Sequence, residues 1–173
     1  MMLFEQWGEF YLMAGGAAAV LIGLIFVVVT LMHDRPRSSV LAGSKLYMGP
    51  VLLHVSMVLI LSAAALTPVI TAREIAVIAG VLALYAAVRG LWSTVGIGRL
   101  KDEVHWTDVW FYGVIPTLLS LALAGVAAGF WTGSAWSTRG VAVVITGLLL
   151  LSIRNEWDLV TWLAPKADTA EGE

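Results

Sequence analysis

Residues Phe10 to Met32 read FYLMAGGAAAVLIGLIFVVVTLM and contain no charged side chain. The hydrocarbon core of a bilayer is about 30 Å thick, and roughly 20 helical residues that rise 1.5 Å each will cross it. The residues before this stretch include Glu5 and Glu9 but no basic residue, and the apolar run is too long for a cleaved signal peptide. We therefore predict a transmembrane helix here.

Further apolar stretches meet the same length requirement, which makes five predicted spans in total. They cover residues 47–70, 74–97, 108–131 and 139–163. Because residues 154–163 include Arg154 and Asp158, they either continue the fifth span or form a short helix on the membrane surface. Trp157 and Trp162 suit a membrane interface, which favours one continuous helix.

The composition of the whole chain agrees with a membrane protein. Of its 173 residues, 60% are hydrophobic and 13% are charged, whereas a soluble domain has about 25% charged residues. The sequence predicts an all-α polytopic transmembrane helix bundle that uses the lipid bilayer as part of its solvent. Residues 1–163 form one predicted domain, and residues 164–173 form a disordered acidic tail. The net charge of −2 gives no reason to expect a nucleic-acid partner, and the lack of cysteine excludes disulfides and thiolate metal sites.

Basic residues in the short loops indicate an orientation, because Lys and Arg favour the cytoplasmic loops of membrane proteins. The loops after the first and third spans and the tail contain Arg35, Arg37, Lys45, Arg99, Lys101 and Lys166. The other side of the membrane would contain only Arg73 and Arg139. We predict that the amino terminus is outside and the carboxy terminus is cytoplasmic.

Small residues at four-residue spacing mark close helix contacts in membranes, because they allow two backbones to approach. Three predicted spans carry such faces, and their residues are Gly15, Ala19 and Gly23; Ala79, Ala83 and Ala87; and Gly125 and Gly129. These faces pack either within one chain or between subunits.

Charged side chains within the spans are costly, by about 2.5 to 3.5 kcal/mol at the centre of a helix on insertion scales. Arg89 and Arg154 lie at similar predicted depth in the cytoplasmic half, and Glu156 and Asp158 adjoin Arg154. Arg154 and Asp158 are four residues apart and are expected to neutralise each other. Arg89 and Glu156 lack such a partner on their own helices, so we expect them to pair between the third and fifth spans. The alternative is that both arginines reach the lipid headgroups and the charges are purely structural.

His54 is the only histidine within a predicted span, and it falls in the same half. Its ring needs a hydrogen-bond partner at that depth. Pro50 disturbs the local helix because it has no N–H to donate to the carbonyl of Leu46. A structural hydrogen bond, proton transfer, ligand binding and metal binding all remain open for His54.

Several catalytic and cofactor patterns are absent from the sequence. It contains no phosphate-binding glycine loop, nucleophile elbow, HExxH pattern or dinucleotide fingerprint. One histidine within the spans cannot supply two haem ligands, and no lysine within a span is present to form a retinal Schiff base. We therefore favour a protein that is not an enzyme, and we expect no cofactor and no metal.

The segment Ala14 to Val27, AGGAAAVLIGLIFV, is followed by a polar loop and a second apolar span. It resembles small multi-pass bacterial membrane proteins of uncharacterised function. The likeness covers mainly the first two spans and rests on small and apolar residues. It implies a location in the bacterial cytoplasmic (inner) membrane and transfers no catalytic or binding residue to this chain.

Two hypotheses for the function follow. The first is a non-enzymatic, oligomeric membrane protein with a polar site in its cytoplasmic half, through which an ion or small solute passes. Its candidate site residues are His54, Arg89, Arg154, Glu156 and Asp158. The second is a structural or accessory subunit that docks onto a larger membrane protein complex through its small-residue faces. The expected partners are the lipid bilayer and either further copies of the chain or another membrane protein.

Overall fold

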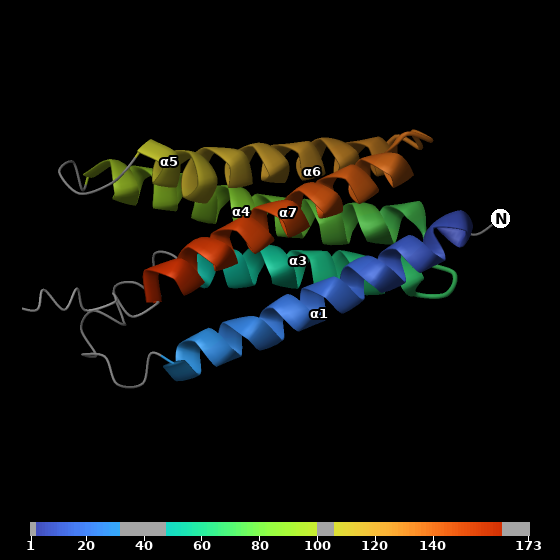
Figure 1. Cartoon of the computed structure of the whole chain (residues 1–173). Helices are drawn as coiled ribbons and strands as arrows, with labels where there is room; N and C mark the ends of the chain where they lie inside the picture. Colours follow the sequence, from blue (N-terminus) through green and yellow to red (C-terminus); the bar gives the residue numbers. More distant parts are fainter. Residues whose placement is uncertain (1–2, 32–47, 100–105, 164–173) are drawn as a thin grey trace, which may run out of the picture.

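The computed structural model describes residues 3–31, 48–99 and 106–163, which form helices joined by short turns, with no β-strand among them (Figure 1). Five of these helices are long and apolar enough to cross a membrane, which confirms the predicted helical class and the number of candidate spans. They are α1 (Gly8–Leu31), α3 (Gly49–Leu66), α4 (Ala72–Arg99), α6 (Ile115–Trp131) and α7 (Ser137–Leu163). The 3-10 turn η1 (Glu5–Trp7) precedes α1, and the short α5 (Trp106–Val109) and the π-helical turn η3 (Trp110–Val114) lead into α6.

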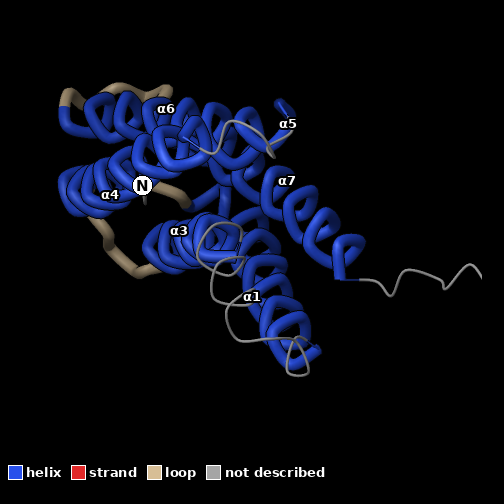
Figure 2. The backbone as a smooth tube through the Cα atoms, turned by 90° about the vertical axis from the view of Figure 1, so that its left-hand side faces the viewer, coloured by secondary structure: helices blue, strands red, loops and turns tan. Residues whose placement is uncertain are grey.

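The long helices form two pairs that α7 joins. Helix α1 packs mainly on α3, α4 packs on α6, and α7 contacts α6, α3 and α1. Figure 2 shows α4 and α6 in one part of the bundle and α1 and α3 in the other. Successive long helices run in opposite directions, so that α1, α4 and α7 all end at the same end of the bundle, away from the amino terminus (Figure 1). We call it the basic end, because the loops and tail with most of the basic residues adjoin it.

Helix α7 is continuous to Leu163, which confirms that the polar residues after position 153 extend the fifth helix. The first predicted span begins and ends close to the bounds of α1, and the third and fifth match α4 and α7 in the same way. The predicted acidic tail and the basic residues Arg35, Arg37, Lys45, Lys101 and Lys166 lie outside the described residues.

The buried side of α1 repeats every three or four residues. It consists of Tyr11, Ala14, Ala18, Leu21, Ile25 and Val28. An average spacing of about 3.5 residues is typical of helices that pack side by side at a small crossing angle.

The prediction of the packing face of α1 is only partly correct. A face built from four-residue steps turns by about 40° with each step, because the helix has 3.6 residues per turn. Gly15 does touch α3, where a Cβ built on it would lie 3.2 Å from the Cβ of Ser62. Ala19 and Gly23 are exposed, so they do not pack within this chain, and the alternative of a contact between subunits stays a prediction for them.

The small residues of α4 behave as predicted. Ala79 and Ala83 are buried and Ala87 is half-buried. Gly90 continues this close approach, since a Cβ built on it would lie 2.6 Å from Oγ1 of Thr117 on α6. The pairing of α4 with α6 thus depends on small side chains along α4.

The predicted pair of glycines on α6 does not form one packing face. Gly125 has no neighbouring atom within 4 Å of an added Cβ. Gly129 lies directly against Ser137, at the start of α7. Gly129 therefore serves the tight turn between α6 and α7, and Gly125 faces out of the bundle.

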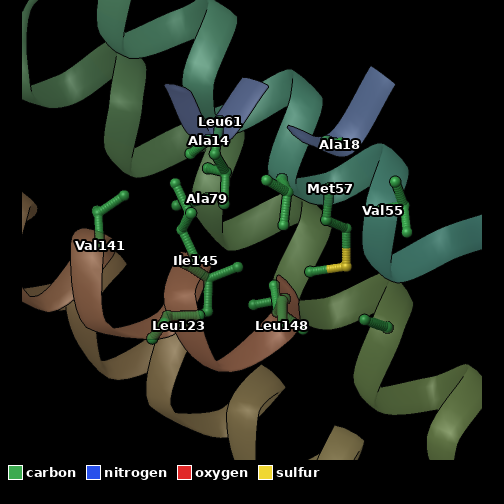
Figure 3. Packing of buried hydrophobic residues seen from close by; sticks show 14 of the residues in the cluster. Ala14, Ala18, Val55, Met57, Leu61, Ala79, Leu123, Val141, Ile145 and Leu148 are labelled. Atoms are coloured by element: carbon green, nitrogen blue, oxygen red, sulfur yellow. The ribbon is translucent and has the colours of Figure 1, made fainter. Parts of the chain in front are cut away.

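The apolar core lies where α7 meets both helix pairs (Figure 3). Leu61 of α3, Leu123 of α6, and Ile145 and Leu148 of α7 have no exposed surface there. In a protein that folds in water, burial of each such side chain would contribute about 1.5 to 3 kcal/mol to the stability of the fold. Lipid is as apolar as the core, so in a membrane these contacts stabilise the fold through close packing instead.

The two turns at the end opposite the basic end differ in backbone strain. Gly133, between α6 and α7, has a φ of 77°, which suits a residue without a Cβ. Val69, between α3 and α4, has a φ of 62°, and a β-branched residue rarely adopts this left-handed conformation. The side chain of Val69 is 79% exposed, so no buried contact compensates for the strain.

Replacing Val69 with Gly should raise the free energy of unfolding by about 1 kcal/mol, because glycine adopts the left-handed conformation without a steric penalty. The matched substitution Gly133→Ala should lower it by a similar amount, since it adds a Cβ to the same type of backbone. Thermal unfolding of the purified protein in detergent would measure both changes. A lower melting temperature for V69G than for G133A would contradict the prediction.

Candidate functional site

The π-helical turn η3 creates a hydrogen-bonding requirement next to Pro116. In η3 the N–H of Ile115 donates to the carbonyl of Trp110, five residues earlier. The same pattern would have residue 116 donate to the carbonyl of Phe111, but proline has no N–H. The amide of Asn155 on α7 supplies a donor instead, with Nδ2 at 3.4 Å from the Phe111 carbonyl oxygen.

Arg154 and Asp158 strengthen this contact between α7 and η3. Nη1 of Arg154 lies 2.7 Å from Oδ2 of Asp158, which confirms the predicted ion pair. The guanidinium carbon lies 3.4 Å from the centroid of the Phe111 ring, within the range of a cation–π contact. Nη1 of Arg154 also donates to Oδ1 of Asn155 at 3.3 Å, and the hydroxyl of Tyr112 donates to the Asn155 carbonyl at 3.3 Å.

We call Phe111, Tyr112, Arg154, Asn155 and Asp158 the clamp. Their polar groups are partnered with one another, as expected of contacts that hold two helices together. The sequence prediction included Arg154 and Asp158 in the candidate site but did not identify Phe111 or the role of Asn155. The sequence feature that could have indicated this contact was Pro116, which lies in the middle of an apolar span and cannot donate a backbone hydrogen bond.

Arg89 and Glu156 do not pair, so that prediction was wrong. The Arg89 side chain is exposed on α4, and Oε1 of Glu156 has no hydrogen-bond partner. The physical reason is helix rotation: α4 packs mainly on α6, whereas Glu156 faces α1 and α3. Two residues at a similar predicted depth in the membrane do not meet when they lie on sides of their helices that face different neighbours.

Glu156 borders a small, partly open hollow near the basic end. The other lining residues come from α1, from α3 and the residue that precedes it, and from α7, and they are Ile25, Val28, Met48, Val51 and Leu159. The volume of the hollow is about 10 Å³, which is about the space that one water molecule needs. Glu156 is 8% exposed, and every other side chain that lines the hollow is apolar.

His54 and Ser152 lie one helical turn deeper than the hollow. His54 follows Val51 on α3, and Ser152 precedes Glu156 on α7. Because α3 and α7 are antiparallel and meet around the hollow, these two residues share nearly the same depth. Both side chains are buried, and neither Nδ1 of His54 nor Oγ of Ser152 has a hydrogen-bond partner.

We call His54, Ser152 and Glu156 the buried polar trio. The structural hydrogen bond considered for His54 is not made at Nδ1. A buried ionised carboxylate without a counter-charge costs several kcal/mol, and each unpartnered polar atom costs about 1 to 3 kcal/mol. A proton or a small cation at Glu156 would remove the largest of these costs. Among the described residues, no group of three His, Asp or Glu side chains is placed to hold a metal ion.

Comparisons with protein-family models, with curated proteins and with solved structures find no match to this chain. They neither support nor contradict the resemblance to small bacterial membrane proteins.

From the contacts of the clamp we predict that Asn155 and Pro116 are coupled in their effects on the free energy of unfolding. Asn155→Leu should lower the free energy of unfolding by about 1 to 3 kcal/mol, because the partly buried Phe111 carbonyl loses its donor. In a Pro116→Ala background the loss should be smaller, since residue 116 then carries an N–H that can bond to that carbonyl. A double-mutant cycle on unfolding in detergent micelles would measure the coupling.

Ser152→Ala is the matched control, because it changes a buried polar residue on the same helix whose Oγ has no partner. It should leave the free energy of unfolding unchanged or slightly raised. If Asn155→Leu were no more harmful than Ser152→Ala, the contact between Asn155 and Phe111 would not stabilise the bundle.

Proposed function

We propose that this chain is a non-enzymatic multi-pass membrane protein in which Glu156 takes up a proton during the passage of protons across the membrane. In this proposal the five long helices are the spans, and the basic end faces the cytoplasm. The resemblance to small bacterial membrane proteins makes the bacterial inner membrane the expected location. Further copies of the chain are expected to accompany it there.

The orientation is supported by the distribution of basic residues over the two ends. Arg99, at the end of α4, and the loops and tail beside it contribute six Lys or Arg residues. The turns at the opposite end contribute only Arg73 and Arg139. Cytoplasmic loops carry the excess of Lys and Arg in membrane proteins, so the basic end is the cytoplasmic end of this proposal.

The observation that carries the proposed function is the buried, unpartnered Oε1 of Glu156 beside an apolar hollow. Ionisable residues within membrane spans are rare, and they commonly mark proton or ion paths. A purely structural carboxylate would be expected to have a basic partner, as Asp158 has in Arg154. Among the described residues no basic side chain pairs with Glu156, although Arg154 lies only two residues away on the same helix.

The small size of the hollow favours a proton, rather than a larger solute, as the species that passes through the protein. A volume of about 10 Å³ admits one water molecule but not an organic solute. The apolar lining offers no set of oxygen ligands such as a desolvated metal cation requires. His54 and Ser152, one turn deeper, are side chains that can accept and donate a proton.

A second candidate function, an accessory subunit, is favoured by the outward face of α1. Gly16, Ala19 and Gly23 are exposed there, and an added Cβ at either glycine would meet no atom within 4 Å. Small residues of this kind let another membrane helix approach closely. Purification would distinguish the two candidates, since an accessory subunit would copurify with a larger complex.

The proposed orientation can be tested by cysteine labelling, because the chain contains no cysteine of its own. A cysteine at Ser38 or Lys166 should react with a membrane-impermeant reagent only from the cytoplasmic side. A cysteine at Ser134, in the exposed turn between α6 and α7, should react only from outside. Labelling of Ser38→Cys and Ser134→Cys from the same side would contradict both the five spans and the orientation.

Proton flux in proteoliposomes tests the role of Glu156. Glu156→Gln keeps the size of the side chain but cannot exchange a proton, so it should lower the flux by about 100-fold, within the range of effects seen for proton-transfer groups. A pH-sensitive dye inside the vesicles would report the rate. Glu9→Gln is the matched control, because Glu9 is exposed at the start of α1. Equal flux in the Glu156→Gln variant and the unmodified protein would rule out the proposed role.

A further inference from the structure

The unpartnered polar atoms within the described part of the bundle are confined to three helices. Besides the trio, they are the hydroxyls of Tyr11, Ser62 and Ser137, so that all of them lie on α1, α3 or α7. On α6, by contrast, the hydroxyl of Thr117 donates to the Gly113 carbonyl of η3 at 2.7 Å, and that of Ser120 donates to the Pro116 carbonyl of α6 at 2.8 Å. Ser137 lies against Gly129 of α6, whereas Ser62 lies against Gly15 of α1, and Glu156 borders the hollow between α1, α3 and α7. We call the boundary between α1, α3 and α7 the seam.

Tyr11 and Ser62 lie in the half of the seam that is farther from the basic end. Their side chains are 0% and 1% exposed. Ser62 faces Gly15 of α1, where a Cβ built on Gly15 would lie 3.2 Å from the Cβ of Ser62, and Tyr11 lies one helical turn beyond Gly15. The Tyr11 ring packs edge-on against Phe4 and Phe10, at centroid distances of 5.2 and 5.1 Å, which leaves its hydroxyl unsolvated.

We propose that Ser62 and Tyr11 form a second proton-relay site, which continues the route from Glu156 along the seam to the opposite end of the bundle. This inference rests on the proposed function of Glu156. The chemical species that passes is a proton carried by water and hydroxyl groups. At each hydroxyl, the oxygen accepts a proton from a water on one side and releases its own proton to a water on the other. No net bond is made or broken, and no co-reactant is needed.

The two parts of the route are separated by an apolar layer. His54 and Ser62 are eight residues apart on α3, a distance of about 12 Å along the helix axis. Val55, Val58 and Leu61 lie between them and have no exposed surface. Apolar constrictions of this kind block conduction by excluding water. The structure therefore corresponds to a closed state of the route, in which the seam must open slightly to admit water.

Val58 occupies the middle of this apolar layer. It is four residues from His54 and four from Ser62, and all three side chains are buried. A hydroxyl at position 58 would divide the dry gap into two shorter steps. Threonine has nearly the shape of valine, and Val58→Thr therefore adds the hydroxyl with little change in volume.

The experiment measures proton flux in proteoliposomes for Tyr11→Phe, Ser62→Ala and Val58→Thr. Each of the first two variants removes only an oxygen that has no partner, so the fold should be retained. Each should lower the flux by about tenfold, which corresponds to about 1.4 kcal/mol in barrier height. Val58→Thr should raise the flux by a similar factor, and Ser62→Ala should abolish that rise. Ser120→Ala is the matched control, because its hydroxyl is satisfied within α6, and its flux should not change.

The outcomes separate this inference from the proposed function. If Glu156→Gln stops the flux but Tyr11→Phe and Ser62→Ala leave it unchanged, the second relay site is overturned and the role of Glu156 stands. If the unmodified protein conducts no protons above empty vesicles, both proposals fall. A rise in flux with Val58→Thr that persists in the Ser62→Ala background would place the route away from Ser62 and overturn the inference.

Discussion

The hydrogen bond from Asn155 to the Phe111 carbonyl fixes how α7 is rotated against the rest of the bundle. It exists because Pro116 supplies no N–H at the position where the π-helical pattern requires one. Successive residues of an α-helix point about 100° apart. Once Asn155 faces η3, the next residue, Glu156, must turn towards α1 and α3. The position of the buried carboxyl is thus a consequence of a missing donor on a different helix.

The long helices could be predicted from the sequence because the thickness of a bilayer sets a minimum apolar length. Which side of each helix is buried could not be predicted in the same way. In a soluble protein the buried side is the apolar side, but for helices in a membrane, lipid and core are both apolar. The exposed Ala19 and Gly23 therefore resemble the buried Ala79 and Ala83 in sequence, and only the packing of neighbouring helices distinguishes them.

The candidate site was predicted only where its contacts are local. Arg154 and Asp158 lie one turn apart on the same helix, so their pairing follows from helix geometry alone. The absence of a partner for Glu156 depends on the rotation of three helices, and depth along the sequence gave the wrong partner, Arg89. The buried hydroxyls of Tyr11 and Ser62 carried no sequence signal, because a hydroxyl within an apolar helix can equally well face its own backbone.

The uneven polarity of the helices also bears on how the protein is made. Helix α1 is the most apolar of the five candidate spans and α7 is the least. A helix such as α1 is stable in lipid by itself, whereas α7 needs partners for its polar side chains. Since α7 follows η3 in the chain, the Phe111 carbonyl of η3 is already synthesised when α7 leaves the ribosome. The segment least able to enter the bilayer alone is thus translated only after the surface that receives it.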